Sequence, residues 1–299
     1  MTAPPIGISG TEFRGEHIDV LLETADSVRA QGVELWHPEN FTAAGAADTV
    51  DRVNRWSGQV FAVSCGVEVA ETADVPHTVS RLLEAVDVAG EVGAPRVNTY
   101  FGAPGYRDDR RSAEDFLRHL APVLARAEQA GVTIVLENEF NAFARDHVRG
   151  DLTRRPAALL RLLREADNPH LKLNFDAANF YCAGVEPFPY AYGLLAPHVD
   201  YLHVKDIRVV DPAAADAGDG LWRRFGDYGD LYATAPLGDG AVNWPGLLRR
   251  LAADGYTGPL TLEPHSVDSH RGAAFAQAAD WLRRTIADIE EYGSTAHVQ

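Results

Sequence analysis

Four short apolar segments in the second half of the chain each end in a residue type that commonly binds metal ions. They are IVLENEF at Glu137, LKLNFDAANF at Asp176, YLHVKDIR at His203 and PLTLEPH at Glu263. Each segment carries β-branched or aromatic residues between turn-forming or polar ones, which is typical of strands in a parallel sheet buried on both faces. Ligands at the carboxyl ends of such strands occupy the catalytic positions of a (β/α)₈ barrel. The pattern therefore predicts one divalent metal site shared by four parallel strands.

Strand-like and helix-like segments alternate along the whole chain, the order that gives a parallel sheet covered by helices. Eight strands are expected, at residues 6–9, 33–36, 60–65, 96–100, 132–137, 171–176, 200–205 and 259–263. Gly32, Gly93, Gly131 and Gly255 each follow a helical stretch, where a left-handed C-cap commonly requires glycine. With 299 residues, 46% of them hydrophobic, we expect an α/β fold in which residues 1–299 form a single TIM-barrel domain.

Two connections that follow strands are longer than a barrel needs. They span residues 98–111 and 206–243, and the second contains the stretch PAAADAGDG. Long loops on the ligand-bearing face of a barrel commonly close over the active site. We therefore expect both segments to act as lid loops.

The net charge restricts the partners of the chain. A formal charge of −16 repels phosphate backbones and anionic lipid headgroups, so neither nucleic acid nor a membrane is an expected partner. The N-terminal MTAPPIGISG lacks a basic stretch followed by an apolar one, which favours a soluble cytoplasmic protein. Cys65 and Cys182 are too few for a disulfide framework and are expected to be reduced.

Period-two alternation tests whether the four ligands can share the barrel interior. The residues predicted to face inward are Thr133, Val135 and Glu137, then Lys172, Asn174 and Asp176, then Tyr201, His203 and Lys205, and finally Thr261, Glu263 and His265. Isolated buried charges are costly, but three carboxylates and one imidazole around a divalent cation compensate one another.

These motifs, in this order and at barrel spacing, resemble the xylose isomerase-like TIM barrel superfamily, the sugar phosphate isomerase and epimerase group that includes tagatose 3-epimerase-like enzymes. The resemblance is carried by LEN at Glu137, NFDAAN at Asp176, HVKD at His203 and the segment PLGDGAVNWPGLLRRLAADGYTGPLTLEPH at Glu263. It implies that these four residues hold one metal ion, most often Mn²⁺, with Mg²⁺, Co²⁺ and Zn²⁺ as alternatives. It also implies self-association, since relatives are often dimers or tetramers.

The ligand chemistry permits removal of a proton alpha to a carbonyl. A divalent ion that binds a ketose carbonyl and the adjacent hydroxyl stabilises an enediolate. Glu137 and Glu263 come from different sides of the site, so one can deprotonate the substrate and the other reprotonate it. We therefore expect a sugar isomerase or epimerase that acts on a ketose or related keto-polyol.

Three further residues near the strand ends have more than one interpretation each. His265 is expected to contact substrate or to make a hydrogen bond within its loop. Lys205 reaches the substrate, stabilises Asp206 or forms a structural salt bridge. Arg208 anchors substrate, orients a ligand or is a solvated loop residue.

Four more residues bear on the choice of reaction. Asn179 stands where relatives often place a substrate-binding histidine, and its amide can bind a hydroxyl but cannot transfer a proton at neutral pH. Glu34 and Trp36 end the second strand and are expected to point into the pocket, Trp36 as an apolar wall. His147 lies in the loop FNAFARDHVRGD after Glu137, as an additional acid or base or as a partly exposed loop residue.

Two other enzyme classes use a similar scaffold. The first is a lyase, in which the intermediate expels a β-leaving group; dehydratases of keto-inositols and dehydroshikimate, and C-glycoside deglycosidase catalytic subunits, resemble this plan. Asn179, His147 and the long second loop favour it, and a deglycosidase would also need a small partner subunit. The second is an endonuclease IV-like DNA repair enzyme, which needs histidines that this chain lacks; its acidic character also opposes DNA binding.

Overall fold

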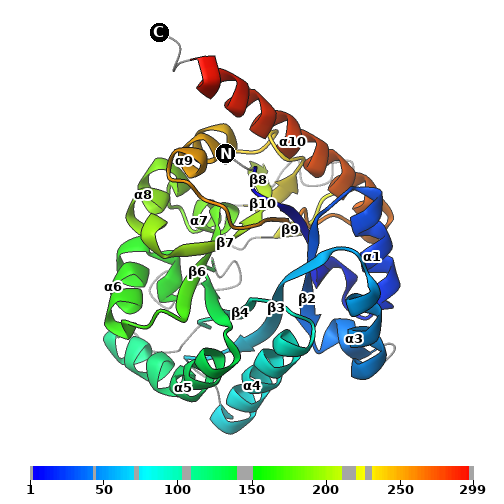
Figure 1. Cartoon of the computed structure of the whole chain (residues 1–299). Helices are drawn as coiled ribbons and strands as arrows, with labels where there is room; N and C mark the ends of the chain where they lie inside the picture. Colours follow the sequence, from blue (N-terminus) through cyan, green and yellow to red (C-terminus); the bar gives the residue numbers. More distant parts are fainter. Residues whose placement is uncertain are drawn as a thin grey trace.

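Eight parallel strands close into a barrel in the order β1-β11-β7-β6-β5-β4-β3-β2 (Figure 1). The computed structural model describes residues 3–42, 45–70, 74–102, 109–139, 151–210, 220–225 and 231–295. The barrel strands are β1 (Ile6–Ser9), β2 (Gly32–His37), β3 (Gln59–Glu68), β4 (Arg96–Tyr100), β5 (Thr133–Glu137), β6 (Leu171–Asp176), β7 (Val199–Val204) and β11 (Leu260–Leu262). The predicted (β/α)₈ fold is confirmed, and the strand bounds agree to within one to three residues.

Helices surround the ring of strands (Figure 1). They are α1 (Ile18–Ser27), α2 (Glu39–Thr42), α3 (Ala46–Arg55), α4 (Val75–Glu91), α5 (Asp109–Ala130), α6 (Pro156–Ala166), α7 (Ala177–Cys182), α8 (Tyr192–Leu195), α9 (Trp244–Ala253) and α10 (Arg271–Thr295). Several of these helices are preceded by an N-cap residue, whose side chain accepts a hydrogen bond from a free backbone N–H of the first turn. Asp74 caps α4 in this way, Asn243 caps α9, and the predicted ligand Asp176 caps α7.

The glycine prediction holds at three of its four positions. Gly93, Gly131 and Gly255 have φ angles of 68°, 68° and 72°, the left-handed conformation that follows a helix end. Gly32 was wrongly predicted as a cap, because it is the first residue of β2. A Cβ atom there would lie 2.5 Å from the ring of Phe61, so the position needs glycine for packing inside the barrel rather than for its backbone angle.

The segment 206–243 is partly a small sheet rather than only a lid loop. Strands β8 (Asp206–Val210), β10 (Leu231–Ala235) and β9 (Arg224–Phe225) form an antiparallel sheet in the order β8-β10-β9. The carboxylate of Asp206 accepts backbone N–H groups from Ile207, Gly238, Gly240 and Val242 at 3.0–3.1 Å. Asp206 therefore fixes the return of the chain toward α9. Of the other predicted lid, residues 103–108 lie outside the described residues.

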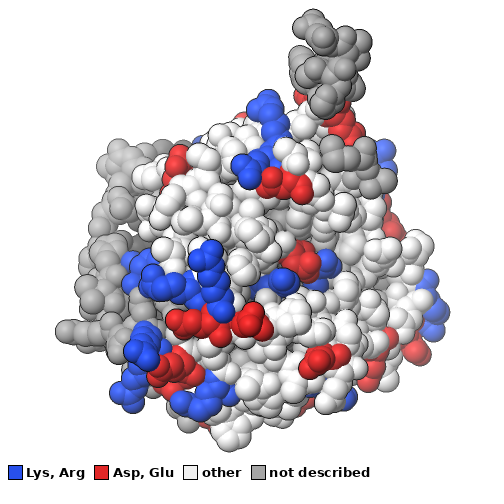
Figure 2. Space-filling model, turned by 60° about the vertical axis from the view of Figure 1, so that its left-hand side comes forward, with Lys and Arg blue, Asp and Glu red and all other residues white. Residues whose placement is uncertain are grey.

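The surface shown in Figure 2 carries acidic and basic side chains close to one another. Such mixing is typical of a solvated face. No helix in the described part of the chain is long and apolar enough to cross a membrane.

Candidate metal centre

The four predicted ligands meet at the carboxyl end of the barrel. Glu137 ends β5, Asp176 ends β6, His203 lies in β7 and Glu263 directly follows β11, and these strands are consecutive neighbours in the barrel. All four side chains are buried, and one ligand atom from each lies within 4.8 Å of the others. Asn138 connects the ends of β5 and β6. Its side-chain oxygen accepts the N–H of Asp176, and its side-chain NH₂ donates to the carbonyl oxygen of Asp176, each at 2.9 Å.

The two ring nitrogens of His203 face different carboxylates. Nδ1 lies 3.1 Å from Glu137 Oε1 and 3.6 Å from Glu263 Oε2. Nε2 lies 2.7 Å from Oε2 of Glu34, on the opposite edge of the ring. Burial lowers the pKa of His203, but these three carboxylates outweigh it and raise the pKa well above its usual value. In the absence of an ion, the ring is therefore an imidazolium.

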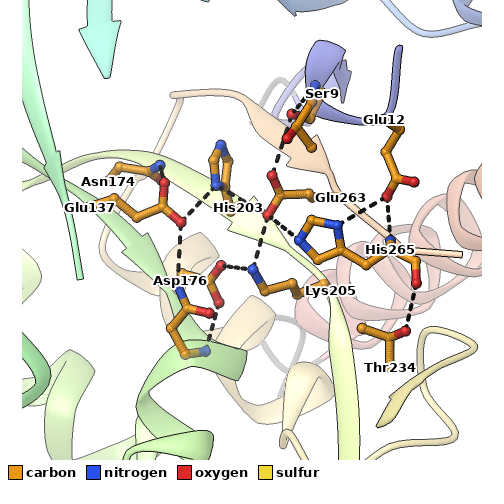
Figure 3. A network of polar contacts seen from close by, with 12 residues as sticks. Ser9, Glu12, Glu137, Asn174, Asp176, His203, Lys205, Thr234, Glu263 and His265 are labelled. Atoms are coloured by element: carbon orange, nitrogen blue, oxygen red, sulfur yellow. Dashed lines mark hydrogen bonds and ion pairs between the residues drawn. The ribbon is translucent and has the colours of Figure 1, made fainter. Parts of the chain in front are cut away.

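Lys205 lies between two of the predicted ligands (Figure 3). Its Nζ is 2.7 Å from Asp176 Oδ2 and 2.9 Å from Glu263 Oε2. Burial lowers the pKa of Lys205, yet the neighbouring carboxylates raise it well above the usual value. Lys205 thus forms a buried salt bridge within the centre, and it does not pair with Asp206, which is bound by backbone N–H groups.

Three amides surround the carboxylate of Glu137. Asn98 and Asn174 donate to its Oε2 at 2.9 and 3.2 Å, and Asn179 donates to its Oε1 at 3.3 Å. Burial raises the pKa of Glu137, but His203 outweighs burial and holds the pKa below its usual value. Glu137 is therefore ionised at neutral pH.

The donor set and its charge fit a divalent cation. Four buried carboxylates, those of Glu34, Glu137, Asp176 and Glu263, stand against two cationic side chains, His203 and Lys205. A metal ion on Nδ1 requires a neutral His203, so of these two side chains only Lys205 stays cationic in the bound centre, and a divalent ion supplies most of the positive charge that the carboxylates still lack. Three carboxylate oxygens and one imidazole nitrogen form a ligand set that divalent metal ions accept.

His265 extends this network toward the N-terminal strand (Figure 3). Its Nε2 lies 3.3 Å from Glu263 Oε2, and its Nδ1 lies 3.3 Å from Glu12 Oε1. Its carbonyl oxygen accepts the hydroxyl of Thr234 at 2.8 Å, which fixes the loop backbone at a φ of 50°. Burial lowers the pKa of His265, but Glu263 and Glu12 raise it to about 9.

A family model described as xylose isomerase-like TIM barrel matches residues 59–285. The chain belongs to this family. The match confirms the resemblance that the four motifs indicated in the sequence.

Similar proteins of the xylose isomerase-like family include enzymes of two reaction types. The curated 3-dehydroshikimate dehydratase of Bacillus anthracis is 21% identical over 227 residues, covering 74% of this chain and 76% of that protein. The solved structure of L-ribulose 3-epimerase matches with a TM-score of 0.75 and 16% identity over 99% of both chains. A xylose isomerase-like TIM barrel protein from Mycobacterium smegmatis in complex with magnesium matches with a TM-score of 0.70 and 16% identity, over 96% of this chain and 98% of that one. At these identities the solved structures establish the fold, and the reaction is left open.

The remaining predicted site residues differ in their contacts with the candidate metal centre. Asn179 is buried beside Glu137, and Trp36 is 6% exposed, with its indole N–H donating to Glu34 Oε1 at 3.2 Å. Arg208 is exposed on β8. His147 lies outside the described residues.

Sequence reasoning missed several contributors to the site, among them Asn98 and Asn138. Glu12 and Ser9 were not predicted, although both follow closely on the first strand: Ser9 is its last residue, and Glu12 lies in the 3-10 turn Gly10–Phe13. A carboxylate just beyond the carboxyl end of a barrel strand is itself a signal for a site residue. Glu34 was expected only to line the pocket, yet it contacts the ligand His203 directly.

A second buried acid near the site gives a prediction for pH. Asp151 is 1% exposed and accepts the N–H of Thr153 at 2.7 Å, and burial raises its pKa to about 7. Because the folded protein disfavours the ionised form, the native state loses stability as pH rises from about 4, the pKa of an unfolded Asp, to about 7.

We expect Asp151→Asn to remove this loss. The variant should be more stable than the wild type by about 4 kcal/mol at pH 8 and equally stable below pH 4. Urea unfolding at pH 4, 6 and 8 measures the difference. A constant difference at all three values would show that Asp151 does not titrate in this range.

Proposed function

We propose that this protein is a divalent-metal-dependent isomerase or epimerase of a ketose or related keto-polyol. The proposal is carried by the convergence of Glu137 and Glu263 on the same ring nitrogen of His203, at 3.1 and 3.6 Å. Burial raises the pKa of each glutamate, yet neighbouring cations outweigh it and lower both. An ionised carboxylate can take a proton from the substrate, and the second carboxylate, on a strand that is not a neighbour in the barrel, can return one once it has itself received a proton from solvent.

The side chains of the centre divide the work of such a reaction. A bound divalent cation, which we propose is Mn²⁺, would supply positive charge beside the carbonyl oxygen of the substrate. One glutamate accepts the proton from the carbon alpha to the carbonyl, and the other glutamate returns a proton to the neighbouring carbon or to the opposite face. Lys205 donates a hydrogen bond to a substrate oxygen, and Trp36 forms an apolar wall. The side-chain oxygen of Asn179 accepts a substrate hydroxyl, because its amide hydrogens are donated to Glu137 and Asn138.

A lyase is the second candidate, and His265 is the observation that favours it. Between Glu12 and Glu263, with a pKa of about 9, His265 is an imidazolium at neutral pH. In a dehydration, a glutamate takes the alpha proton, the carbon–oxygen bond at the beta carbon breaks, and His265 donates its proton to the departing hydroxyl, giving water and an enone. A curated relative from Bacillus anthracis is a 3-dehydroshikimate dehydratase. Self-association, and a small partner subunit in a deglycosidase, stay predictions.

Proton NMR in D₂O distinguishes the two reactions. Mn²⁺-activated protein, with the excess ion removed by chelation before spectra are recorded, would be incubated with ketoses, inosose, dehydroshikimate and 3-keto-glycosides. We expect deuterium at a retained or inverted carbon for an isomerase or epimerase, and an alkene signal or released aglycone for a lyase. Protein treated with EDTA from the start is the control. If no substrate of the panel exchanges or reacts only when the ion is present, the proposed function is wrong.

A further inference from the structure

Glu34 is a fully buried carboxylate whose hydrogen bonds all point to other parts of the site. Its Oε2 lies 2.7 Å from Nε2 of His203, and both side chains have no exposed surface. Its Oε1 accepts the hydroxyl of Ser9 at 2.9 Å and the indole N–H of Trp36 at 3.2 Å. Glu34 is not among the four side chains whose ligand atoms gather within 4.8 Å of one another in the described part of the chain.

The two ring nitrogens of His203 have different roles because the ring orientation gives them different partners. Nδ1 faces Glu137 and Glu263, which are two of the other ligands, so this nitrogen is the one that points at the ion. A neutral imidazole carries one hydrogen, and the nitrogen that binds a metal must be the one without it. The hydrogen must therefore stand on Nε2, and Glu34 is the group that accepts it.

The backbone around Glu34 also keeps this carboxylate in place. The side chain of Asn40 accepts the N–H of Trp36 at 2.7 Å, which closes the turn after β2. At Gly10, a Cβ atom would lie 2.5 Å from the carbonyl oxygen of Glu34, so only glycine allows the first strand end to pack this closely. Glu34 is thus held from its backbone and from both carboxylate oxygens.

We propose that Glu34 is a positioning residue of the metal centre, which keeps the hydrogen of His203 on Nε2 and thereby presents Nδ1 to the ion. The inference rests on the proposed metal-dependent function and adds to it a residue on a strand that supplies no ligand. Carboxylates that bind the second nitrogen of a ligand histidine typically change metal affinity by about 10- to 100-fold. The carboxylate of Glu34 also accepts the indole N–H of Trp36, so Glu34 orients both the proposed pocket wall and the ligand His203.

Titration calorimetry with Mn²⁺ tests the inference without an assay of turnover. We expect Glu34→Gln to raise the Kd for Mn²⁺ by about 10- to 100-fold relative to the wild type. Glu114→Gln is the control, because Glu114 undergoes the same substitution but is 60% exposed on α5, where it pairs with Arg110. Its Kd should stay within about threefold of the wild-type value.

A spectroscopic measurement reports the hydrogen of His203 itself. In ¹⁵N-histidine-labelled, Zn²⁺-loaded protein, we expect the wild-type His203 signals to show a protonated Nε2 and a metal-bound Nδ1, and Glu34→Gln to lose this single pattern. Signals are assigned by their absence in His203→Asn. Should Glu34→Gln fail to fold, Glu34→Asp keeps the charge but withdraws the carboxylate by one methylene, and it should weaken Mn²⁺ binding as well.

The outcomes separate this inference from the proposed function. Equal Mn²⁺ affinity in Glu34→Gln and wild type, or an equal loss in Glu114→Gln, overturns the role of Glu34 alone. A wild-type protein that binds neither Mn²⁺ nor Zn²⁺ overturns both proposals. Weakened binding in Glu34→Gln, together with no reaction of any keto-polyol by the wild type, supports the role of Glu34 and contradicts the proposed function.

Discussion

Replacing Glu263 with glutamine is expected to lower kcat of the Mn²⁺-loaded protein by at least about 10³-fold while the barrel stays folded. The substitution removes a proton acceptor, which is typically worth about 10² to 10⁴-fold. It also removes one ligand charge from a site where Lys205, His203 and His265 all contact this carboxylate, at 2.9, 3.6 and 3.3 Å. Both losses act on the same step, so they should reinforce each other.

The rate of deuterium incorporation into the substrate, measured by NMR, reports this loss. Glu114→Gln is a matched control, because Glu114 is 60% exposed and pairs with Arg110 on the surface of α5. This control should retain the wild-type rate, and circular dichroism should be the same for all three proteins. A rate within about threefold of the wild type in Glu263→Gln would remove Glu263 from the proton-transfer step.

The sequence predicted the four ligand positions because two independent regularities meet there. Parallel strands buried on both faces are recognisable from their composition, and in a barrel their last residues must lie at one end. Glu137, Asp176, His203 and Glu263 were therefore brought together by counting strands alone. That Lys205 faces the same interior also followed from alternation.

Other contacts join residues that are far apart in the sequence, so no local sequence pattern predicts them. Glu34 and His203 are separated by 169 residues, and they meet only because the barrel closes between β1 and β2 on one side and β1 and β11 on the other. Lys205 makes the salt bridge that was one of its three interpretations, and the described residues show no pairing with Asp206, since side chains of adjacent residues in extended backbone point to opposite sides. The sheet of β8, β9 and β10 was missed because its strands belong to no barrel repeat.

The second large prediction concerns Lys205. It is one of only two lysines in the chain, and the other is Lys172. The Lys205 ammonium is 5% exposed and lies against Asp176 and Glu263, whose side chains are 0% and 5% exposed. Its pKa is raised well above the usual value, so the contribution of this cation to stability is fully present at neutral pH and lost only in strong alkali. Among the described residues, no other side chain forms an ion pair with both of these carboxylates.

We therefore expect Lys205→Met, in EDTA at pH 7, to lower the free energy of unfolding by about 3 to 5 kcal/mol, the usual cost of leaving a buried charge without its partner. Saturating Mn²⁺ should restore more stability to this variant than it adds to the wild type, because the ion then compensates the carboxylates that Lys205 leaves behind. Urea unfolding with and without Mn²⁺ measures both effects. Lys172→Met, at a half-buried position of β6, is the matched control and should change stability by about 1 kcal/mol or less. If Lys205→Met is as stable as the wild type in EDTA, the carboxylates of the centre are already neutral without an ion, and the charge argument for a divalent cation is wrong.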